Sequence, residues 1–380
     1  MWHARIFKAV SMLSSSSWSS CDLLSWQAIH AAYSTTESSL KTIQMKTLKT
    51  VAAFLAVIAV SSQVVAASSP DRNIFSAPAT AAPPPGVDPL TAEINAHDAL
   101  RFAHLMRDGA IPTAQTLQRN YLDGAGPGVK VFTPMRIVDA DRLAKVVAAK
   151  PDVYRYAIQK CLPQLPTLQS DLRAIYLAFT GLLPERPLPA IDIVFGAGNS
   201  GGTASRDRQV IGLEVTCPLG TTSEQFRTTL RGFFAHETVH TWQDDETPQA
   251  LADPMLSQSL REGVADYLAT LVTGAVPNLD RDGWARQRES WLWQEFLRDR
   301  QAMLADSDSV RNPLASQRFK RWFANCGSAV EGWPCEAGYW VGMRIAEAYV
   351  ARAHDKRAAI HELLELRDPG AILKASGYGQ

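Results

Sequence analysis

The stretch FRTTLRGFFAHETVHTW, residues 226–242, decides how this chain is interpreted. Its apolar residues recur at helical spacing, which predicts a helix with one buried face. They are Leu230, Phe233, Phe234 and Val239. Thr222 or Ser223 can cap the start of the helix, and Asp244 and Asp245 end it.

Within this helix, His236, Glu237 and His240 form the pattern His-Glu-x-x-His. Residues four apart lie on one face of a helix, so both imidazoles can reach one metal ion, with Glu237 beside it. Zinc suits two neutral imidazoles and a carboxylate, and it makes its bound water acidic enough to attack a carbonyl group. Glu237 can take the proton from that water. The alternative is a helix with two surface histidines and an ordinary glutamate.

A second helix is predicted at residues 260–268, with an apolar stripe on one side. The stripe consists of Leu256, Leu260, Val264 and Leu268. Glu262 and Asp266 are four apart and share a face. A catalytic zinc needs three protein ligands and one open position, so Glu262 is the expected third ligand. Asp266 would accept a hydrogen bond from a ligand histidine and fix its tautomer. The alternative is a solvated acidic face.

This arrangement resembles the gluzincins, the thermolysin-like metallopeptidases. They combine the His-Glu-x-x-His pattern on one helix with a glutamate on the next helix, and often an aspartate one turn later. The resemblance implies that His236, His240 and Glu262 hold Zn²⁺, with Glu237 as the general base. The 21 residues between His240 and Glu262 make a longer gap than is usual in gluzincins.

Two further segments narrow the resemblance. Residues 191–214, IDIVFGAGNSGGTASRDRQVIGLE, predict a strand, a glycine-rich loop and a second strand, and residues 338–342, GYWVG, open a late helix. Their order is similar to that in a family of predicted zinc-dependent proteases that includes bacterial gliding-motility lipoproteins, over about residues 90–380. The resemblance implies an α+β, mostly α-helical fold of the thermolysin type, with a small β-sheet before the helix of residues 226–242. No lipobox cysteine follows the leader, so we expect no lipid anchor.

In gluzincin-like folds, the edge strand beside the metal-binding helix holds an extended peptide by main-chain pairing. Gly201, Gly202 and Thr203 could serve this role, because glycine allows close approach of another backbone. The alternative is a mobile hairpin loop. Related enzymes place a second donor to the tetrahedral oxyanion after the metal ligands. Tyr339 is our candidate for it, and its alternative is a core tyrosine.

The start of the chain has the form of an export signal. Residues 45–67 combine a basic start, an apolar run at 51–60 and small residues for cleavage after Ala66 or Ala67. Met45 is then the true start, or residues 1–44 extend the leader. The apolar run is too short for a stable membrane span. Residues 68–89 are an Ala-, Pro- and Ser-rich linker, and residues 90–380 form the metallopeptidase-like domain. We expect a periplasmic or secreted protein.

Four cysteines follow the leader, an even number that permits two disulfides in an exported protein. Cys326 and Cys335 enclose a short flexible loop and are expected to pair, which leaves Cys161 with Cys217. The alternative is four buried thiols. The formal net charge is zero and the charges are interleaved, so no nucleic-acid partner is expected.

The rest of the domain is predicted to be mainly helical. The expected helices cover residues 93–108, 136–148, 152–162, 165–180, 283–304, 339–355 and 356–366. Trp284, Trp291 and Trp293 either fill the core or line a cleft wall. His97 and His104 lie on one helix face, where polar packing is favoured over a second metal site.

Together these features predict a metallopeptidase that hydrolyses peptide bonds, with a peptide or protein as its substrate. Two alternatives stay open. One is a secreted binding or assembly protein on a peptidase scaffold, and the other is a zinc amidase acting on cell-wall amide bonds. The sequence does not predict the cleavage specificity, the choice between endo- and exopeptidase action, or the oligomeric state.

Overall fold

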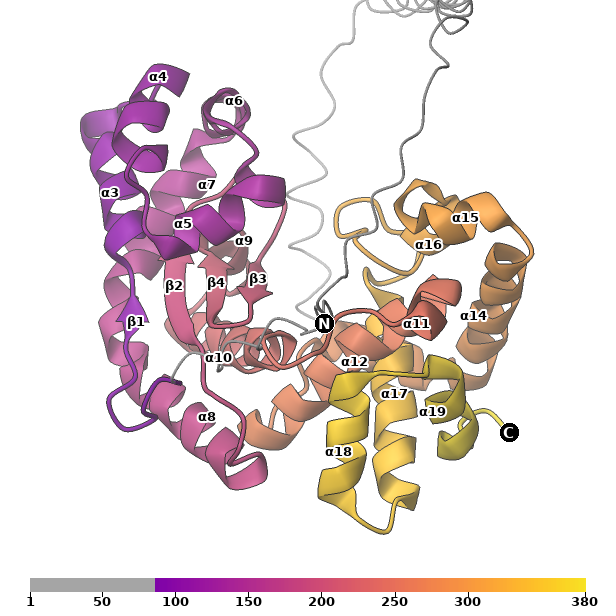
Figure 1. Cartoon of the computed structure of the whole chain (residues 1–380). Coiled ribbons are helices and arrows are strands. Elements are labelled where there is room, and N and C mark those ends of the chain that lie inside the picture. The colour runs from indigo at the N-terminus through magenta and orange to yellow at the C-terminus, as the bar shows by residue number, and fades with distance from the viewer. Residues whose placement is uncertain (1–85) are drawn as a thin grey trace, which may run out of the picture. The chain divides into compact units, whose positions relative to one another are not determined.

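The computed structural model describes residues 86–380. The predictions for the leader, for residues 1–44 and for most of the linker therefore lie outside the described residues. The described residues belong to one compact unit, which covers residues 80–380. The described part of this unit is mostly helical with one small sheet, which confirms the α+β prediction (Figure 1). No helix in residues 86–380 is both long enough and apolar enough to cross a bilayer.

The sheet has four strands in the order β1-β2-β4-β3. Strands β1 (Ile94–Asn95), β2 (Ala190–Val194) and β4 (Arg208–Gly212) run parallel, and β3 (Gly202–Ser205) pairs antiparallel with β4 at the edge. The inner strands β2 and β4 are buried almost throughout, as expected for strands covered on both faces. The predicted single strand after the glycine-rich loop is thus a hairpin of β3 and β4. The chain leaves β4 at Gly212 and enters a short helix, α9 (Leu213–Thr216).

The helices around the sheet precede the His-Glu-x-x-His pattern in the sequence (Figure 1). They are α3 (His97–Leu105), α4 (Ala114–Leu117), α5 (Pro127–Phe132), α6 (Ala140–Ala149), α7 (Pro151–Tyr156) and α8 (Gln169–Leu182). Three of these helices begin later in the sequence than predicted. The predicted helix at 93–108 begins at His97 because Ile94 pairs with β2. The one at 136–148 begins at Ala140, after a positive φ of 72° at Val138, and the one at 165–180 begins after Pro166.

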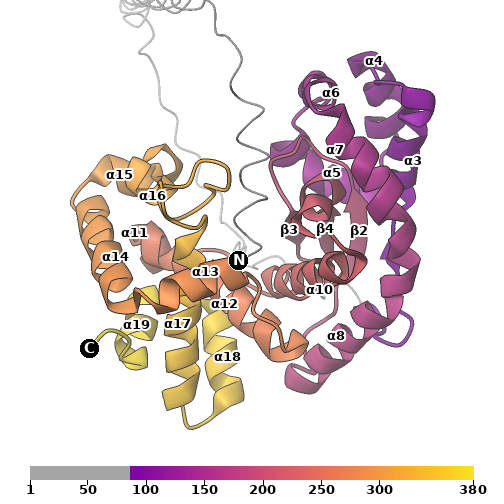
Figure 2. The ribbon, with the colours of Figure 1, turned by 180° about the vertical axis from the view of Figure 1, so that it is seen from behind.

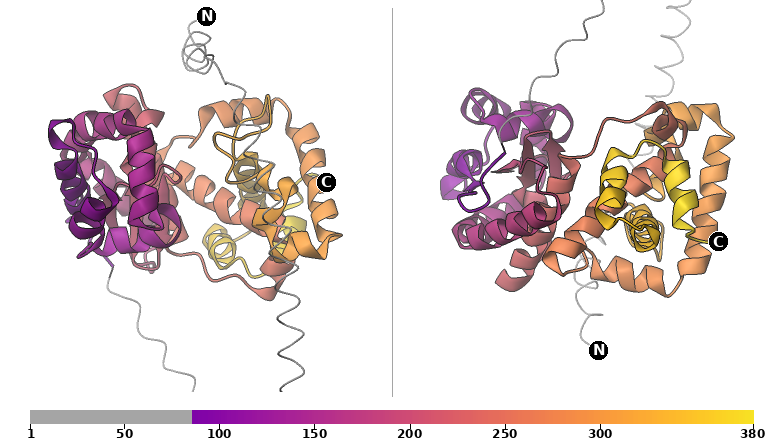
Figure 3. Two further views of the ribbon diagram at one scale, coloured as in Figure 1. Left: turned by 90° about the horizontal axis from the view of Figure 1, so that it is seen from above. Right: turned by 60° about the horizontal axis from the view of Figure 1, so that its bottom comes forward.

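The remaining helices form the C-terminal part of the unit. They are α10 (Ser223–His240), α11 (Pro248–Ala252), α12 (Pro254–Thr273), α13 (Leu279–Arg286), α14 (Glu289–Leu304), α15 (Ser307–Arg311), α16 (Gln317–Lys320), α17 (Ala337–Arg352), α18 (Lys356–Glu365) and α19 (Pro369–Ser376). Figures 2 and 3 show α14 at the outer side of this group. The single helix predicted at 283–304 is wrong, because the chain breaks between α13 and α14. Trp293 is buried, whereas Trp291 is exposed.

Helices α12 and α17 lie side by side. Their closest approach is at two glycines, Gly263 and Gly342. A Cβ atom placed on Gly342 would come within 1.7 Å of the main-chain oxygen of Ser259. The hydroxyl of Ser259 also donates a hydrogen bond to the carbonyl oxygen of Gly338 at 2.5 Å. Glycine is therefore required at this crossing because the backbones touch.

Both predicted disulfides are present. Cys161 pairs with Cys217 and links the helical turns before α8 and after α9. Cys326 pairs with Cys335 and closes the loop that leads into α17. Two disulfides are typical of a protein that folds in an oxidising compartment.

Glu214, at the start of α9, is a buried carboxylate beside the glycine-rich loop. Its Oε1 atom accepts a hydrogen bond from the main-chain N–H of Gly198 at 3.1 Å. Its Oε2 atom has no hydrogen-bond partner among the described residues. Burial raises the pKa of this carboxyl to about 7. A carboxyl with a raised pKa binds its proton more tightly in the folded than in the unfolded protein.

Glu214→Gln should therefore change how stability depends on pH. The contribution of Glu214 to the free energy of unfolding is fully present below about pH 4.5. It is lost as the pH rises towards 7, by about 3 kcal/mol in total. As the pH rises over this range, the free energy of unfolding of the variant should therefore increase by that amount relative to the wild type. Urea unfolding with a chelator present, at a series of pH values, measures it. Glu331→Gln, at an exposed position, is the control, and a difference that stays constant with pH would contradict the assignment.

Candidate metal centre

Helix α10, which carries the His-Glu-x-x-His residues, is fixed by its N-terminal cap and by its buried face. Thr222 and Gln225 form a capping box at its start, as the sequence predicted for this cap. Phe226, Leu230 and Phe234 are buried on its inner face. Helix α12 packs against α10, so the two helices bring their polar residues together.

The three predicted ligands lie together. The Nε2 atoms of His236 and His240 are 2.9 Å apart, and they lie 3.3 and 3.2 Å from Oε2 of Glu262. Tetrahedral ligands with Zn–N bonds of about 2.0–2.1 Å are about 3.3 Å from one another. The triangle of donor atoms therefore fits a zinc ion. All three side chains are largely buried but not sealed, as a site with an open position requires.

Each predicted histidine ligand is oriented by a hydrogen bond at its Nδ1 atom. Nδ1 of His236 lies 2.9 Å from Oδ1 of Asp266, as predicted. Nδ1 of His240 lies 2.7 Å from Oε1 of Gln243. Carboxylate and amide oxygens only accept, so both imidazoles donate through Nδ1–H and leave their Nε2 atoms free to bind a metal.

The third ligand is held in the same way, by a residue that the sequence reasoning missed. Gln258 donates to the second oxygen of Glu262 at 2.8 Å, which leaves Oε2 for a metal. Gln258 and Glu262 are four apart on α12, and this spacing is the signal that could have identified the pair. The role of Gln243 was missed too. It follows His240 by three residues, and its amide also donates to the main-chain oxygen of Arg261 at 2.6 Å.

Arg281, on α13, is another site residue that the sequence did not suggest. Its guanidinium donates to Asp266, and it stacks over the ring of Tyr339 at 5.2 Å. The ring of Tyr339 lies parallel to that of His236, with 6.1 Å between centroids. The structure thus places Tyr339 beside a predicted ligand, where it also packs against the hydrophobic core. No local sequence pattern links α13 to α12, because the contact depends on the tertiary fold.

The charges of the site favour a cation. Burial opposes charge on His236, but Asp266 and Glu262 raise the pKa of this imidazole well above its usual value. Burial also opposes charge on Glu262, but His240 and His236 lower the pKa of its carboxyl. A site that attracts positive charge so strongly also suits a divalent ion, and metal binding would displace protons from the histidines.

Glu237 differs from the ligands in its surroundings. It is 6% exposed, and burial raises the pKa of its carboxyl, which makes it a stronger base than an exposed glutamate. Strand β3 passes directly over it. A Cβ atom on Gly202 would lie 2.2 Å from Oε1 of Glu237, and one on Gly201 would lie 2.6 Å from the ring of Phe233. The predicted residues Gly201, Gly202 and Thr203 therefore lie at the edge of the sheet, next to the metal centre.

Gly202→Ala should disturb Glu237 without removing a ligand. The added methyl group overlaps the carboxylate, so either the side chain or the strand must move. With Glu237 as the general base that the sequence predicts, we expect the predicted hydrolysis to fall by roughly tenfold or more and metal content to stay unchanged, since a small misplacement of a catalytic group is costly. Activity and metal analysis of the purified variant measure both effects. Gly232→Ala, on α10 with open space around it, should change neither.

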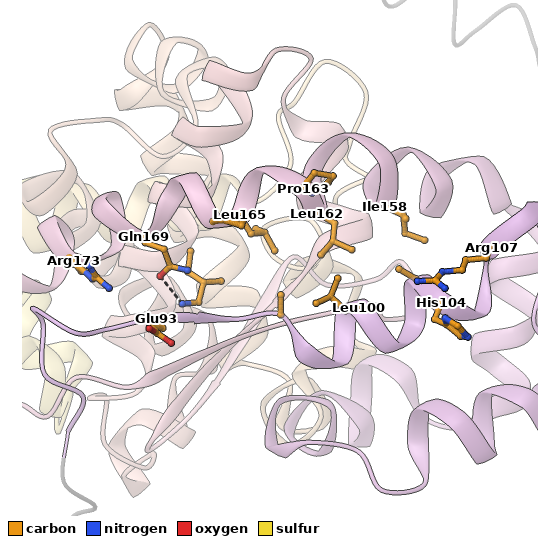
Figure 4. Close-up of a pocket in the computed structure, with 14 residues that line it drawn as sticks. Glu93, Leu100, His104, Arg107, Ile158, Leu162, Pro163, Leu165, Gln169 and Arg173 are labelled. Atoms are coloured by element: carbon orange, nitrogen blue, oxygen red, sulfur yellow. Dashed lines mark hydrogen bonds between the residues drawn. The ribbon is translucent and has the colours of Figure 1, made fainter.

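The other predicted polar pair does not form a site. His97 and His104 are both exposed, and neither belongs to a group of possible metal ligands within residues 86–380. His104 instead borders a groove of about 700 Å³ between α3 and the segment before α8 (Figure 4). Its lining is mainly apolar, with Leu100, Ile158 and Leu162 among the side chains drawn. The groove contains none of the residues of the metal centre.

The protein thus has an α+β fold in which two packed helices bring two histidines and a glutamate together. Residues 143–380 match the family described as gliding motility protein GldB. The match covers more than half of the chain, and the chain belongs to this family. No curated protein and no solved structure gives a significant match.

Proposed function

We propose that this protein is an exported, zinc-dependent peptidase of the gluzincin type. The observation that carries the proposal is the triangle of donor atoms from His236, His240 and Glu262, with the separate, buried Glu237 beside it. A purely structural site would need no additional base. The ligand set leaves one position of a tetrahedral site for water, as in catalytic zinc centres.

When bound, zinc supplies a Lewis acid that polarises the scissile carbonyl and acidifies the attacking water. Glu237 accepts the proton of that water and passes it to the leaving amine. Its buried carboxyl suits this role because burial raises its basicity. Tyr339 is proposed to donate a hydrogen bond to the developing oxyanion, and its place beside His236 supports this role.

The substrate is proposed to bind along β3. This strand is the edge of the sheet, so its free side can pair with an extended peptide. The contact of Gly202 with Glu237 would then bring the peptide backbone close to the base. The glycines at 201 and 202 keep the strand free of side chains that would hold a substrate away.

Export is supported by two observations. Both pairs of cysteines are joined as disulfides, which persist in oxidising compartments. The family is described by gliding motility, a process of the cell surface. We therefore propose that the protein acts outside the cytoplasm, in the periplasm or beyond.

Metal analysis and an activity screen of one sample test the proposal. We expect about one zinc ion per chain and cleavage of members of a peptide library that a chelator stops and added zinc restores. Peptidoglycan fragments in the same screen test the amidase alternative. A protein that retains no metal contradicts the zinc site, and a fully zinc-loaded protein that cleaves nothing favours the binding or assembly alternative.

A further inference from the structure

Glu336 occupies an unusual backbone position next to the metal centre. It follows Cys335 of the disulfide loop and precedes α17, with φ 58° and ψ 38°, in the left-handed region. Residues with a Cβ atom adopt this conformation only at a cost, and glycine or asparagine is the usual choice. A strained non-glycine residue beside a candidate site suggests that its side chain is used.

The backbone of Glu336 is fixed on both sides. Its N–H donates to Oδ1 of Asn325 at 2.7 Å, and its carbonyl oxygen accepts from Arg281 at 3.3 Å. The disulfide between Cys326 and Cys335 closes the loop that carries it. The side chain therefore projects from a rigid point, as a recognition group must.

The carboxylate of Glu336, by contrast, has only a distant ion-pair partner among the described residues. Within residues 86–380 no donor hydrogen-bonds it, and its nearest cation, Arg281, is 4.0 Å away and already donates to Asp266. The side chain is 28% exposed, so a ligand can reach it. Burial raises the pKa of this carboxyl; the charge of Arg281 opposes the rise, and the charges of Glu262 and Asp266 add to it. Glu336 thus lies within the electrostatic field of the metal centre without being a ligand.

We propose that Glu336 is a specificity-determining residue that binds a protonated primary amine of the substrate. The amine is either the α-amino group of a peptide or a side-chain amine of the lysine type. The inference rests on the proposed function, because it places the substrate at the metal centre. Arg281 donates to Asp266 and stays 4.0 Å from the carboxylate of Glu336, which can therefore accept a hydrogen bond from a second, closer cation.

Three zinc-binding probes test the proposal without requiring hydrolysis. They are leucine hydroxamate, N-acetyl-leucine hydroxamate and Nα-acetyl-lysine hydroxamate. Each is titrated calorimetrically into the zinc-loaded full chain at low salt. We expect one of the two amine-bearing probes to bind about tenfold more tightly than the neutral one. Preference for the first probe identifies an α-amino group, and preference for the third identifies a side-chain amine.

The variant Glu336→Gln should bring the preferred amine probe to the affinity of the neutral probe. The affinity for the neutral probe should stay unchanged, which also shows that the centre is intact. Glu331→Gln, in the same disulfide loop but exposed, is the matched control and should keep the preference. If Glu336→Gln lowers the affinity for all three probes, the salt dependence of the wild-type protein tests the proposal. An amine preference that is due to charge must decrease as salt is added.

The titrations distinguish a failure of the proposed role of Glu336 from a failure of the proposed peptidase function. Equal binding of all three probes by the wild-type protein overturns the role of Glu336 and leaves the peptidase proposal standing. A preference that survives in Glu336→Gln, or one that salt does not reduce, overturns it as well. If no hydroxamate binds to protein with a full complement of zinc, the metal centre is closed to ligands, and both proposals are wrong.

Discussion

Glu237→Gln is expected to abolish hydrolysis while the protein keeps its zinc. Glutamine has nearly the same shape as glutamate, so it fits beneath Gly202 without a new clash. It cannot accept a proton, and loss of a general base lowers rates by roughly 10²–10⁴-fold. The donor atoms come from other residues, so metal content should stay at the wild-type value. Activity and metal analysis of the variant measure the two effects.

Glu262→Gln is the matched comparison for this prediction, since it changes a ligand by the same chemistry. It should lower zinc content as well as activity, because an amide oxygen is a weaker ligand for zinc than a carboxylate. The contrast between the two variants separates base from ligand. Full activity of Glu237→Gln would show that the base is assigned wrongly, and loss of zinc from it would show that Glu237 holds the metal.

The cluster of His236, His240 and Glu262 could be predicted from sequence because it follows local rules. His236 and His240 share a helix face by their spacing, and so do Glu262 and Asp266. Each pair needs only a correct helix assignment, and α10 and α12 are long helices with buried faces. That the two faces meet came from the resemblance to gluzincins rather than from the pattern itself.

The residues that complete the site could not be predicted, because their contacts depend on distant segments. Arg281 reaches Asp266 from α13, and Glu336 arrives from the disulfide loop before α17. Neither residue belongs to a motif. The short strand β1 was also missed, since two residues, Ile94 and Asn95, carry no detectable alternation and extend only because β2 lies beside them.

The two glycines where α12 crosses α17 show a third kind of limit. The sequence predicts helices around both Gly263 and Gly342, yet nothing in it indicates that the two glycines face each other. A Cβ atom on Gly263 would lie 2.1 Å from the main chain of α17. The contact is between backbones, so no pattern of side chains reports it.

Gly342→Ala should therefore cause a large loss of stability. The new methyl group would overlap the main-chain oxygen of Ser259, and a backbone atom cannot rotate away as a side chain can. Separating α12 from α17 also opens a well-packed core, so we expect a loss of roughly 3 kcal/mol or more in the free energy of unfolding. Urea unfolding with a chelator present measures it, so that zinc binding does not mask the effect.

The same change should also weaken the metal centre, because α12 carries Glu262 and α17 carries Tyr339. Zinc affinity of Gly342→Ala should fall even in the fraction of protein that stays folded. Gly232→Ala is the control: it adds the same methyl group to a helix with no neighbour within 4 Å, and alanine favours helix, so stability should hold or rise slightly. If the two variants unfold alike, the glycine contact does not hold the helices together, and Glu262 must be positioned by α10 and its own neighbours on α12.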